Sequence, residues 1–253
     1  MTIFHPYFCG MNDFSTGKIR VIGFDADDTL WVNEPFYRET ESKFCELLSY
    51  YAAPDEIQKE LFRIEINNLD LYGYGSKAFI LSLIETAVEV SGGRVTSEIV
   101  AKILEMGKAQ INLRNPLLPG VPEVLRILSG QYRLIVATKG DLLDQERKLR
   151  NSGIANYFHH IEIMSDKTEE NYAKLLKHLD VRPDEFVMVG NSLKSDILPV
   201  VRLGGFAIHV PFHVTWQHEE LEPHEMPDSH FISVDALSEI LPVLGIDPDT
   251  GLQ

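Results

Sequence analysis

The chain has 253 residues, of which 38 are acidic and 23 are basic, so its formal net charge is −15 at pH 7. This negative charge repels polyanions and anionic lipid surfaces, which argues against a partner that is a nucleic acid or a membrane surface. The hydrophobic content of 44% is sufficient for a buried core. Residues 1–18 lack the basic and apolar segments of a secretory signal, no stretch approaches a membrane span, and the only cysteines are Cys9 and Cys45. We therefore expect a folded, cytoplasmic protein, while its oligomeric state stays open.

Five short apolar runs rich in Val, Ile and Phe predict strands that are buried in a parallel sheet. They cover residues 19–24, 132–137, 161–164, 186–189 and 206–210. Helix-like stretches at 142–151, 169–179 and 195–203 separate the later runs, and Gly153 and Gly204 follow the first and last of them, where helices commonly end. Strands that alternate with helices predict a doubly wound, Rossmann-like α/β fold.

The interval between the first two apolar runs has a different character. Residues 33–115 show helical periodicity, for example in Phe79, Leu83 and Ala87, and contain no convincing strand. We therefore predict an α/β core formed by residues 1–32 and 117–253, with a separate helical domain inserted at 33–116.

Two acids, Asp25 and Asp27, follow the first apolar run directly. Residues at positions i and i+2 of an extended chain share a face, so both carboxylates can reach one site, where such a pair can bind a metal ion and transfer protons. Taken alone, the pair could equally be an acidic turn that Thr29 braces. A calcium loop is excluded, because Leu30 stands at the sixth position instead of Gly and Phe36 at the twelfth instead of Glu.

Polar residues also follow the later apolar runs. They are Thr138, Lys167, the segment 190–192 (Gly-Asn-Ser) and Asp196. Each of them alone would be a helix cap, a solvated charge or a turn. Because ligands bind outside the carboxyl ends of the strands in open α/β sheets, their ordered positions predict that they converge on one site.

On these residues, the chain resembles the haloacid dehalogenase-like (HAD) superfamily of hydrolases throughout its core. The first motif of that family, Asp-x-Asp-x-Thr, is matched by residues 25–29, its Ser/Thr motif by Thr138, its lysine by Lys167, and its acidic motif by residues 190–196. The helical insert is similar in its position to the mobile cap of that family.

The resemblance implies a role for each of these side chains. Asp25 would attack a phosphorus atom to form an aspartyl-phosphate, and Asp27 would transfer protons to the leaving group and from water. Mg²⁺ would be bound by Asp25, the Asp27 carbonyl, Asn191 and Asp196. Thr138, the backbone N–H of Lys139 and the side chain of Lys167 would bind the phosphate.

One position departs from the pattern of the family, since Asn191 stands where many members have Asp. An amide oxygen can still coordinate a metal ion, so we expect modestly altered metal binding and retained activity. A catalytically weakened member that acts as a binding protein is the alternative from a different class of function.

The presence of Asp27 favours one reaction of the family, because a poor alkoxide leaving group needs a proton donor and a halide does not. We therefore expect a phosphatase that acts on a small phosphorylated metabolite. Cleavage of phosphonates, another reaction of the family, would need a lysine in the insert, and no sequence pattern marks one. A phosphomutase with the same aspartyl-phosphate is the enzymatic alternative. The substrate stays open among nucleotide, sugar and small-acid phosphates.

Two further groups of residues remain for the structure to place. Tyr72, Tyr74 and Lys77 flank two glycines in the insert and are candidates for substrate specificity, and the alternative is an ordinary connection between helices. His209, His213, His218 and His224 are expected to be solvated loop residues, because Pro211 breaks the helical spacing that a metal cluster would use.

Overall fold

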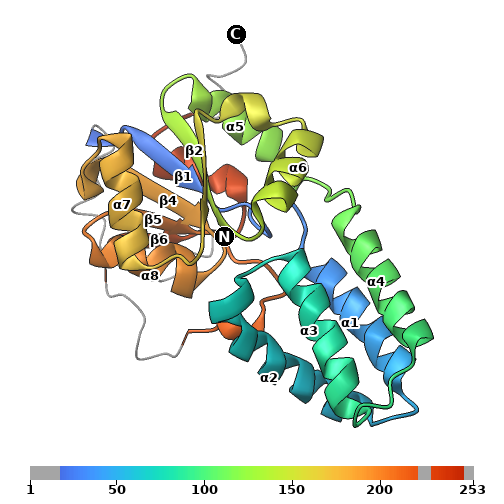
Figure 1. Ribbon diagram of the computed structural model, residues 1–253. Helices are drawn as coiled ribbons and strands as arrows, with labels where there is room; N and C mark the ends of the chain where they lie inside the picture. The colour runs from blue at the N-terminus through green and yellow to red at the C-terminus, as the bar shows by residue number, and fades with distance from the viewer. Residues whose placement is uncertain (1–17, 222–228, 248–253) are drawn as a thin grey trace, which may run out of the picture.

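The computed structural model describes residues 18–221 and 229–247. Cys9 and His224 lie outside these residues. The chain forms two parts, an α/β core and a unit of four helices (Figure 1). Within the described residues, no helix is both long enough and apolar enough to cross a membrane.

The core is built on a parallel sheet of six strands in the order β3-β2-β1-β4-β5-β6. The strands are β1 (Val21–Phe24), β2 (Arg133–Lys139), β3 (His160–Met164), β4 (Phe186–Gly190), β5 (Phe206–His209) and β6 (Phe231–Ser233). The five apolar runs of the sequence correspond to β1 to β5, which confirms the predicted α/β fold. The sequence did not reveal β6, a strand of only three residues at the edge of the sheet.

Strand β1 lies in the middle of the sheet and pairs with both β2 and β4. Its last residue, Phe24, is aligned with Val136 on one side and Val189 on the other. The residue that follows it, Asp25, therefore emerges between the ends of two neighbouring strands. This is the position where the chain connections diverge to opposite sides of the sheet and where α/β folds bind ligands.

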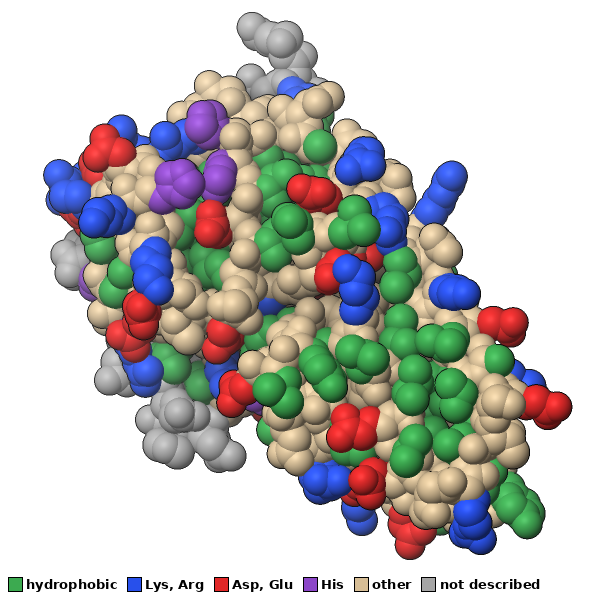
Figure 2. All heavy atoms as spheres, viewed as in Figure 1, with side chains coloured by type: hydrophobic (Ala, Val, Ile, Leu, Met, Phe, Trp, Pro, Cys, Tyr) green, Lys and Arg blue, Asp and Glu red, His purple; other side chains and the backbone are tan. Residues whose placement is uncertain are grey.

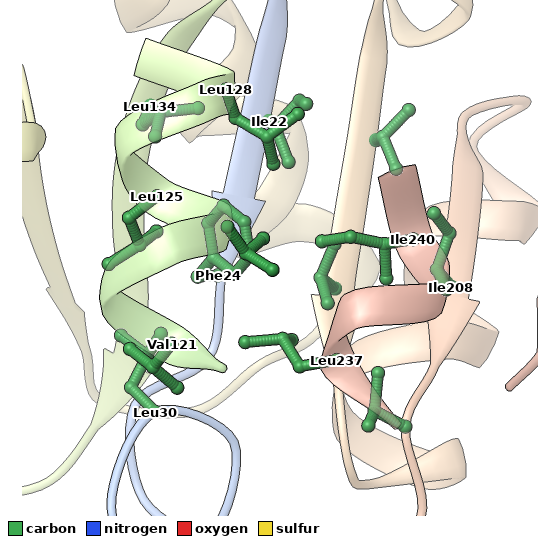
Figure 3. Packing of buried hydrophobic residues seen from close by; sticks show 14 of the residues in the cluster. Ile22, Phe24, Leu30, Val121, Leu125, Leu128, Leu134, Ile208, Leu237 and Ile240 are labelled. Atoms are coloured by element: carbon green, nitrogen blue, oxygen red, sulfur yellow. The ribbon is translucent and has the colours of Figure 1, made fainter. Parts of the chain in front are cut away.

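Apolar side chains cover both faces of the sheet. On one face, Ile22 and Phe24 pack with Leu125 and Leu128 of α5 (Val121–Ser129) and with Ile240 of α9 (Ile240–Val243), as Figure 3 shows. On the other face, Val21, Ile135 and Met188 pack against α7 (Glu169–Leu179) and α8 (Leu198–Arg202). Two buried layers fix the direction in which the strand ends point.

The helices that follow the strands begin and end at residues suited to those positions. Asp141 accepts a hydrogen bond from the backbone N–H of Asp144 at the start of α6 (Leu142–Ser152), and Gly153 ends that helix with φ 76°. The helix predicted at 195–203 has a different form. A π-helical turn (Leu193–Ile197) precedes the short α8, and such turns are frequent at functional sites.

The segment between β1 and α5 folds into the four-helix unit, which comprises α1 (Glu34–Leu48), α2 (Pro54–Tyr72), α3 (Ser76–Val90) and α4 (Ser97–Ile111). Phe44, Leu61, Phe79, Leu83 and Ile103 form an apolar core of its own. The helical content predicted for this part of the chain is therefore observed.

The chain enters and leaves the four-helix unit through two segments that lie side by side. The backbone N–H of Val32 donates to the Pro116 carbonyl at 3.0 Å, and that of Leu118 donates to the Leu30 carbonyl at 2.9 Å. The Asn115 side chain adds a bond of 2.7 Å to the Val32 carbonyl. Backbone hydrogen bonds thus hold the two crossing points together beside the carboxyl edge of the sheet.

Candidate active site

The structure brings the residues that follow the strands together at the carboxyl edge of the sheet. Asp25, Thr138, Lys167 and Asp196 are all buried, with exposed fractions of 7%, 2%, 4% and 1%. These side chains, together with Asp27 and Asn191, line one cavity. Six polar side chains therefore surround a single cavity, and four of them are buried. Because the burial of polar and charged groups costs free energy, protein stability alone does not explain this arrangement.

Lys167 lies between two buried carboxylates. Its Nζ contacts Asp25 Oδ1 and lies 2.6 Å from Asp196 Oδ1. Burial opposes the charge of Lys167, but the two carboxylates outweigh burial and raise its pKa well above the ordinary value. For Asp25, burial is the largest influence and raises the pKa to about 7, while Lys167 acts in the opposite direction.

Asp196 is held by the loop that begins at Gly190. Its Oδ2 accepts a hydrogen bond of 2.9 Å from the backbone N–H of Ser192. A Cβ atom on Gly190 would overlap the Asp196 carboxylate, so only glycine allows this close approach. The sequence Gly-Asn-Ser therefore serves to place Asp196 against Lys167.

Asp27 lies in a tight turn that follows Asp25, in which the backbone N–H of Leu30 donates to the Ala26 carbonyl at 2.8 Å. Three donors surround the Asp27 carboxylate: Trp31 Nε1 at 2.7 Å, Gln145 Nε2 at 2.8 Å and Lys148 Nζ at 2.9 Å. Thr29 Oγ1 donates to Asp25 Oδ2 at 3.3 Å, so it braces the turn as its position in the sequence suggests. The two acids consequently have different surroundings, one beside Lys167 and the other in a cage of three donors.

The next residue, Asp28, connects this turn to the four-helix unit. It has φ 62°, and its carboxylate accepts hydrogen bonds from the backbone N–H groups of Asn33 and Glu34 at the start of α1. Burial raises the pKa of Asp28 to about 7, although these hydrogen bonds act in the opposite direction. Asp28 thus ties the turn that carries Asp25 and Asp27 to the first helix of the unit.

Oxygen atoms converge beside Asp25 in a way that fits a divalent cation. The side-chain amide of Asn191 has one atom 3.2 Å from Asp25 Oδ2 and 3.3 Å from the Asp27 carbonyl oxygen. When that atom is the amide nitrogen, it donates to both oxygens; when it is the amide oxygen, three oxygens face one another. A carboxylate, a backbone carbonyl and an amide oxygen are the ligands that Mg²⁺ prefers, so the residues fit this ion.

The side chain of Lys139 takes part in a second polar cluster. Its Nζ pairs with Glu219, donates to Ser195 Oγ at 2.9 Å and lies 4.1 Å from the centre of the Tyr74 ring. Ser192 Oγ and Ser195 Oγ donate to Glu219 Oε2 at 2.6 Å and 2.5 Å. Burial would raise the pKa of Glu219, but Lys139 and these hydrogen bonds outweigh it and lower the pKa to about 2.

A cavity of about 190 Å³ connects these groups with the four-helix unit. Of the three specificity candidates, Tyr74 lines it and donates to Asp166 Oδ1 at 3.3 Å. Tyr72 is 47% exposed and Lys77 pairs with Asp141 at 2.8 Å, and neither lines the cavity. The structure therefore brings Tyr74 to the site and leaves Tyr72 and Lys77 outside it.

The wall that the four-helix unit contributes to the cavity is acidic. Glu34, Glu41 and Glu65 line it, and Arg38 pairs with the first two at 3.0 Å and 3.3 Å. Burial raises the pKa of Glu34 to about 8 against the effect of Arg38, and burial together with Glu41 raises that of Glu65 to about 8. One arginine beside three carboxyl groups leaves this wall polar, and the raised pKa values favour the neutral, protonated form of Glu34 and Glu65.

Gln145, Lys148 and Glu219 belong to the site, although the sequence alone did not reveal them. Gln145 and Lys148 share a face of α6, and Gln145 also donates to Thr138 Oγ1 at 3.1 Å. The sequence did contain one signal for the first two: Gln145 and Lys148 are three residues apart near the start of the helix that follows Thr138, so they share a face of that helix. Glu219 lies in a short 3₁₀ helix (Gln217–Glu219) after β5, and no local pattern marks it.

The prediction of solvated loop histidines is wrong for His209, which is the last residue of β5, and for His218, which lies in a 3₁₀ helix; both are partly buried, whereas His213 is exposed. His209 contacts Ser233 Oγ and the Asn191 carbonyl at 3.0 Å and 3.1 Å, whereas His218 Nε2 lies 3.4 Å from the Tyr74 hydroxyl. Within the part of the chain that the structure describes, His209, His213 and His218 do not belong to a group with metal-binding geometry.

The arrangement is suited to nucleophilic displacement. It joins a buried carboxylate, a lysine that neutralises charge, a hydroxyl and a second carboxylate with its own donors, and this combination on a doubly wound sheet defines an α/β enzyme. Comparison with known families is more specific. The model of the haloacid dehalogenase-like hydrolases matches residues 19–204, and the chain belongs to this family. The match confirms the family that the sequence motifs indicated.

Individual relatives agree with this assignment. The chain is similar to a haloacid dehalogenase-like family hydrolase from Xanthomonas campestris, with 34% identity, a TM-score of 0.79, and coverage of 90% of this chain and 92% of that one. It is 22% identical to a glyceraldehyde 3-phosphate phosphatase of Methanopyrus kandleri, over 89% of this chain and 97% of the relative. It is 25% identical to human N-acylneuraminate-9-phosphatase, over 71% and 77%.

Proposed function

We propose that this chain is a Mg²⁺-dependent phosphomonoester hydrolase that acts on a small phosphorylated metabolite through an aspartyl-phosphate. The observation that carries the proposal is Asp27, a carboxylate two residues from Asp25 that is held by Trp31, Gln145 and Lys148. A positioned proton donor is useful when the leaving group is an alkoxide and unnecessary when it is a halide. Relatives named as phosphatases support the same choice.

In the first step, an Asp25 oxygen forms a bond to phosphorus while the bond from phosphorus to the ester oxygen breaks. The departing alkoxide takes its proton from the Asp27 carboxyl. Thr138 donates its hydroxyl proton to a phosphoryl oxygen, and Lys167 balances the negative charge that gathers on phosphate and carboxylates.

In the second step, a water oxygen attacks phosphorus, its proton passes to Asp27, and the bond to Asp25 breaks to release phosphate. Trp31, Gln145 and Lys148 hold the Asp27 side chain in a fixed orientation for this transfer.

Asp25, the Asp27 carbonyl, Asn191 and Asp196 would hold Mg²⁺. When bound, the ion supplies positive charge that stabilises the phosphoryl oxygens. Asp196 already accepts from Lys167 and Ser192, so it would contribute to the site while it keeps these partners.

The cavity limits the substrate, and the four-helix unit acts as the cap in this proposal. A volume of about 190 Å³ is smaller than the roughly 300–1,000 Å³ of sites for drug-sized ligands, which favours a small metabolite. The wall formed by Glu34, Glu41 and Glu65 is polar, and its carboxyl groups can form hydrogen bonds with a substrate. Leaving groups with hydroxyl or amino groups are therefore favoured.

The test measures hydrolysis of an aryl phosphate and of an alkyl phosphate in a panel of phosphorylated metabolites. We expect activity with Mg²⁺, loss of activity with a chelator, and a loss of at least about a thousandfold in Asp25→Asn, because no nucleophile remains. Unchanged activity in Asp25→Asn would exclude the mechanism. Asp27→Asn should impair the alkyl phosphate more than the aryl phosphate, whose leaving group needs less protonation; equal losses would exclude Asp27 as the proton donor.

A further inference from the structure

A group of three side chains with metal-ligating atoms lies outside the catalytic site. His160 and Glu162 belong to β3, the edge strand of the sheet, and His178 belongs to α7, which covers that part of the sheet. One ligand atom of each residue lies within 4.8 Å of the others. Figure 2 shows histidine side chains gathered at the upper left, beside the region where Figure 1 places α7.

The fold explains why these three residues meet. His160, Glu162 and Met164 are at alternate positions of β3 and therefore share a face of the strand. Met164 packs in the same apolar cluster as Leu175 and Leu179 of α7, which identifies this face as the one against the helix. The helix returns antiparallel to β3, so its last turn brings His178 to the beginning of the strand.

The side chains of the group lie close enough to one another to share one metal ion. His160 Nε2 lies 2.9 Å from Glu162 Oε2, and the ring centres of His160 and His178 are 5.2 Å apart. Ligand atoms at about 2.1 Å from a tetrahedral ion lie roughly 3.4 Å from one another, so small side-chain rotations would complete the geometry. The side chains of His160 and Glu162 are 29% and 32% exposed, which leaves access for an ion and for a water ligand.

We propose that His160, Glu162 and His178 bind a divalent transition-metal ion of the Zn²⁺ type. Two imidazole nitrogens and one carboxylate suit Zn²⁺, Co²⁺ or Ni²⁺, whereas Mg²⁺ prefers oxygen ligands throughout. The site lies at the amino end of β3, and Lys167 lies beyond its carboxyl end, about 13 Å or more away at 3.3 Å per residue. The bound ion would link the edge strand to the last turn of α7.

The experiment titrates the full chain with Zn²⁺ by calorimetry, with excess Mg²⁺ present so that sites made of oxygen ligands are occupied. We expect one Zn²⁺ to bind per chain, with the affinity reduced at least tenfold in His178→Ala and in His160→Ala. His159→Ala is the matched control, because it removes the neighbouring histidine, which is exposed and outside the group, and should leave the affinity unchanged.

A second measurement records the melting temperature with and without Zn²⁺. Zn²⁺ should raise it in the parent protein and in His159→Ala, and should have no such effect in His178→Ala. Absence of saturable binding in the parent, unchanged affinity in His178→Ala, or an equal loss in His159→Ala would each overturn the proposal. Phosphatase activity does not enter either measurement, so the result is independent of the function proposed for the catalytic site.

Discussion

Lys167 is the residue that balances the charge of the buried site. Its side chain is 2% exposed and lies between Asp25 and Asp196. In Lys167→Met, the two carboxylates would face each other without a cation. Breaking a buried ion pair commonly costs about 3–5 kcal/mol, and we expect a decrease of about 3 kcal/mol in the free energy of unfolding, together with loss of activity. Urea unfolding of the protein without Mg²⁺ measures the decrease.

A surface lysine of the same region provides the control for this prediction. Lys174 on α7 pairs with Glu170, but both side chains are mainly exposed, and Lys174→Met should change the free energy of unfolding by less than about 0.5 kcal/mol. Asp196→Asn added to Lys167→Met should recover part of the lost stability, because one buried charge is removed. Equal effects of Lys167→Met and Lys174→Met would contradict the importance of the buried pair.

Under the proposed mechanism, Lys148 would affect catalysis through Asp27. Its Nζ bonds to Asp27 Oδ1 at 2.9 Å and to Asn33 Oδ1 at 2.8 Å, so it helps to fix the orientation of the Asp27 carboxyl group. We expect Lys148→Met to lower kcat on alkyl phosphates about tenfold or more, and on aryl phosphates by clearly less. Arg150→Met, an exposed position of the same helix, removes the same charge and should leave both rates within twofold. Parallel losses on both substrates in Lys148→Met would argue against positioning of Asp27.

The connection between α2 and α3 is the element that brings the four-helix unit against the core. Gly75 has φ 109°, and a Cβ atom there would lie 2.7 Å from the Asp141 backbone nitrogen at the start of α6. Gly75→Ala should therefore separate α3 from α6 and lower kcat/KM at least tenfold, as steady-state kinetics would show. Gly73→Ala is matched, because φ is 69° but the space is open; it should cost about 1 kcal/mol of stability with little effect on kcat/KM. Equal kinetic effects would contradict a specific contact at Gly75.

The elements that sequence analysis found are those whose local pattern and environment agree. Buried parallel strands appear as continuous apolar runs, so β1 to β5 could be predicted within a few residues. Strand β6 has three partly exposed residues and no such run. The region of α8 contains helical residues, but the loop that positions Asp196 imposes a π-helical turn, which no sequence period indicates.

The same reasoning explains which site residues could be predicted. Asp25 directly follows β1, Thr138 is the residue before the last one of β2, and Lys167 lies just beyond the end of β3. Parallel strands bring their carboxyl ends to one edge. Lys148 and Glu219 reach the site from a helix face and from a loop, and their proximity depends on how these elements pack. The sequence is sufficient to predict that a residue lies near the end of a strand, but it is not sufficient to predict a contact between elements that are distant in the chain.

At the scale of the whole molecule, the two parts meet across polar contacts. Ser76 Oγ donates to Asp144 Oδ2 at 2.8 Å, and Arg38 Nη2 donates to the Thr215 carbonyl at 3.3 Å. Partly buried acids of the unit, Glu34 and Glu65 among them, lie beside this junction. Their ionisation therefore affects the stability of the assembled protein.

The raised pKa values make stability depend on pH in a defined direction. Burial raises the pKa of Glu34 and Glu65 from 4.5 to about 8, so the folded protein binds protons that the unfolded chain has lost. The contribution of these two protonated groups to the free energy of unfolding is complete below pH 4.5 and is lost as the pH rises to about 8 and above. We expect the free energy of unfolding in urea to fall by at least about 1 kcal/mol between pH 6 and pH 9.

Glu65→Gln should show a smaller fall and exceed the parent in stability at pH 9, whereas Glu105→Gln, at an exposed position of α4, should follow the parent. Glu219, whose pKa is lowered to about 2, acts in the opposite direction, but only below pH 4.5, outside this interval. An identical fall in the parent and in Glu65→Gln would show that Glu65 is ionised in the folded protein throughout this range.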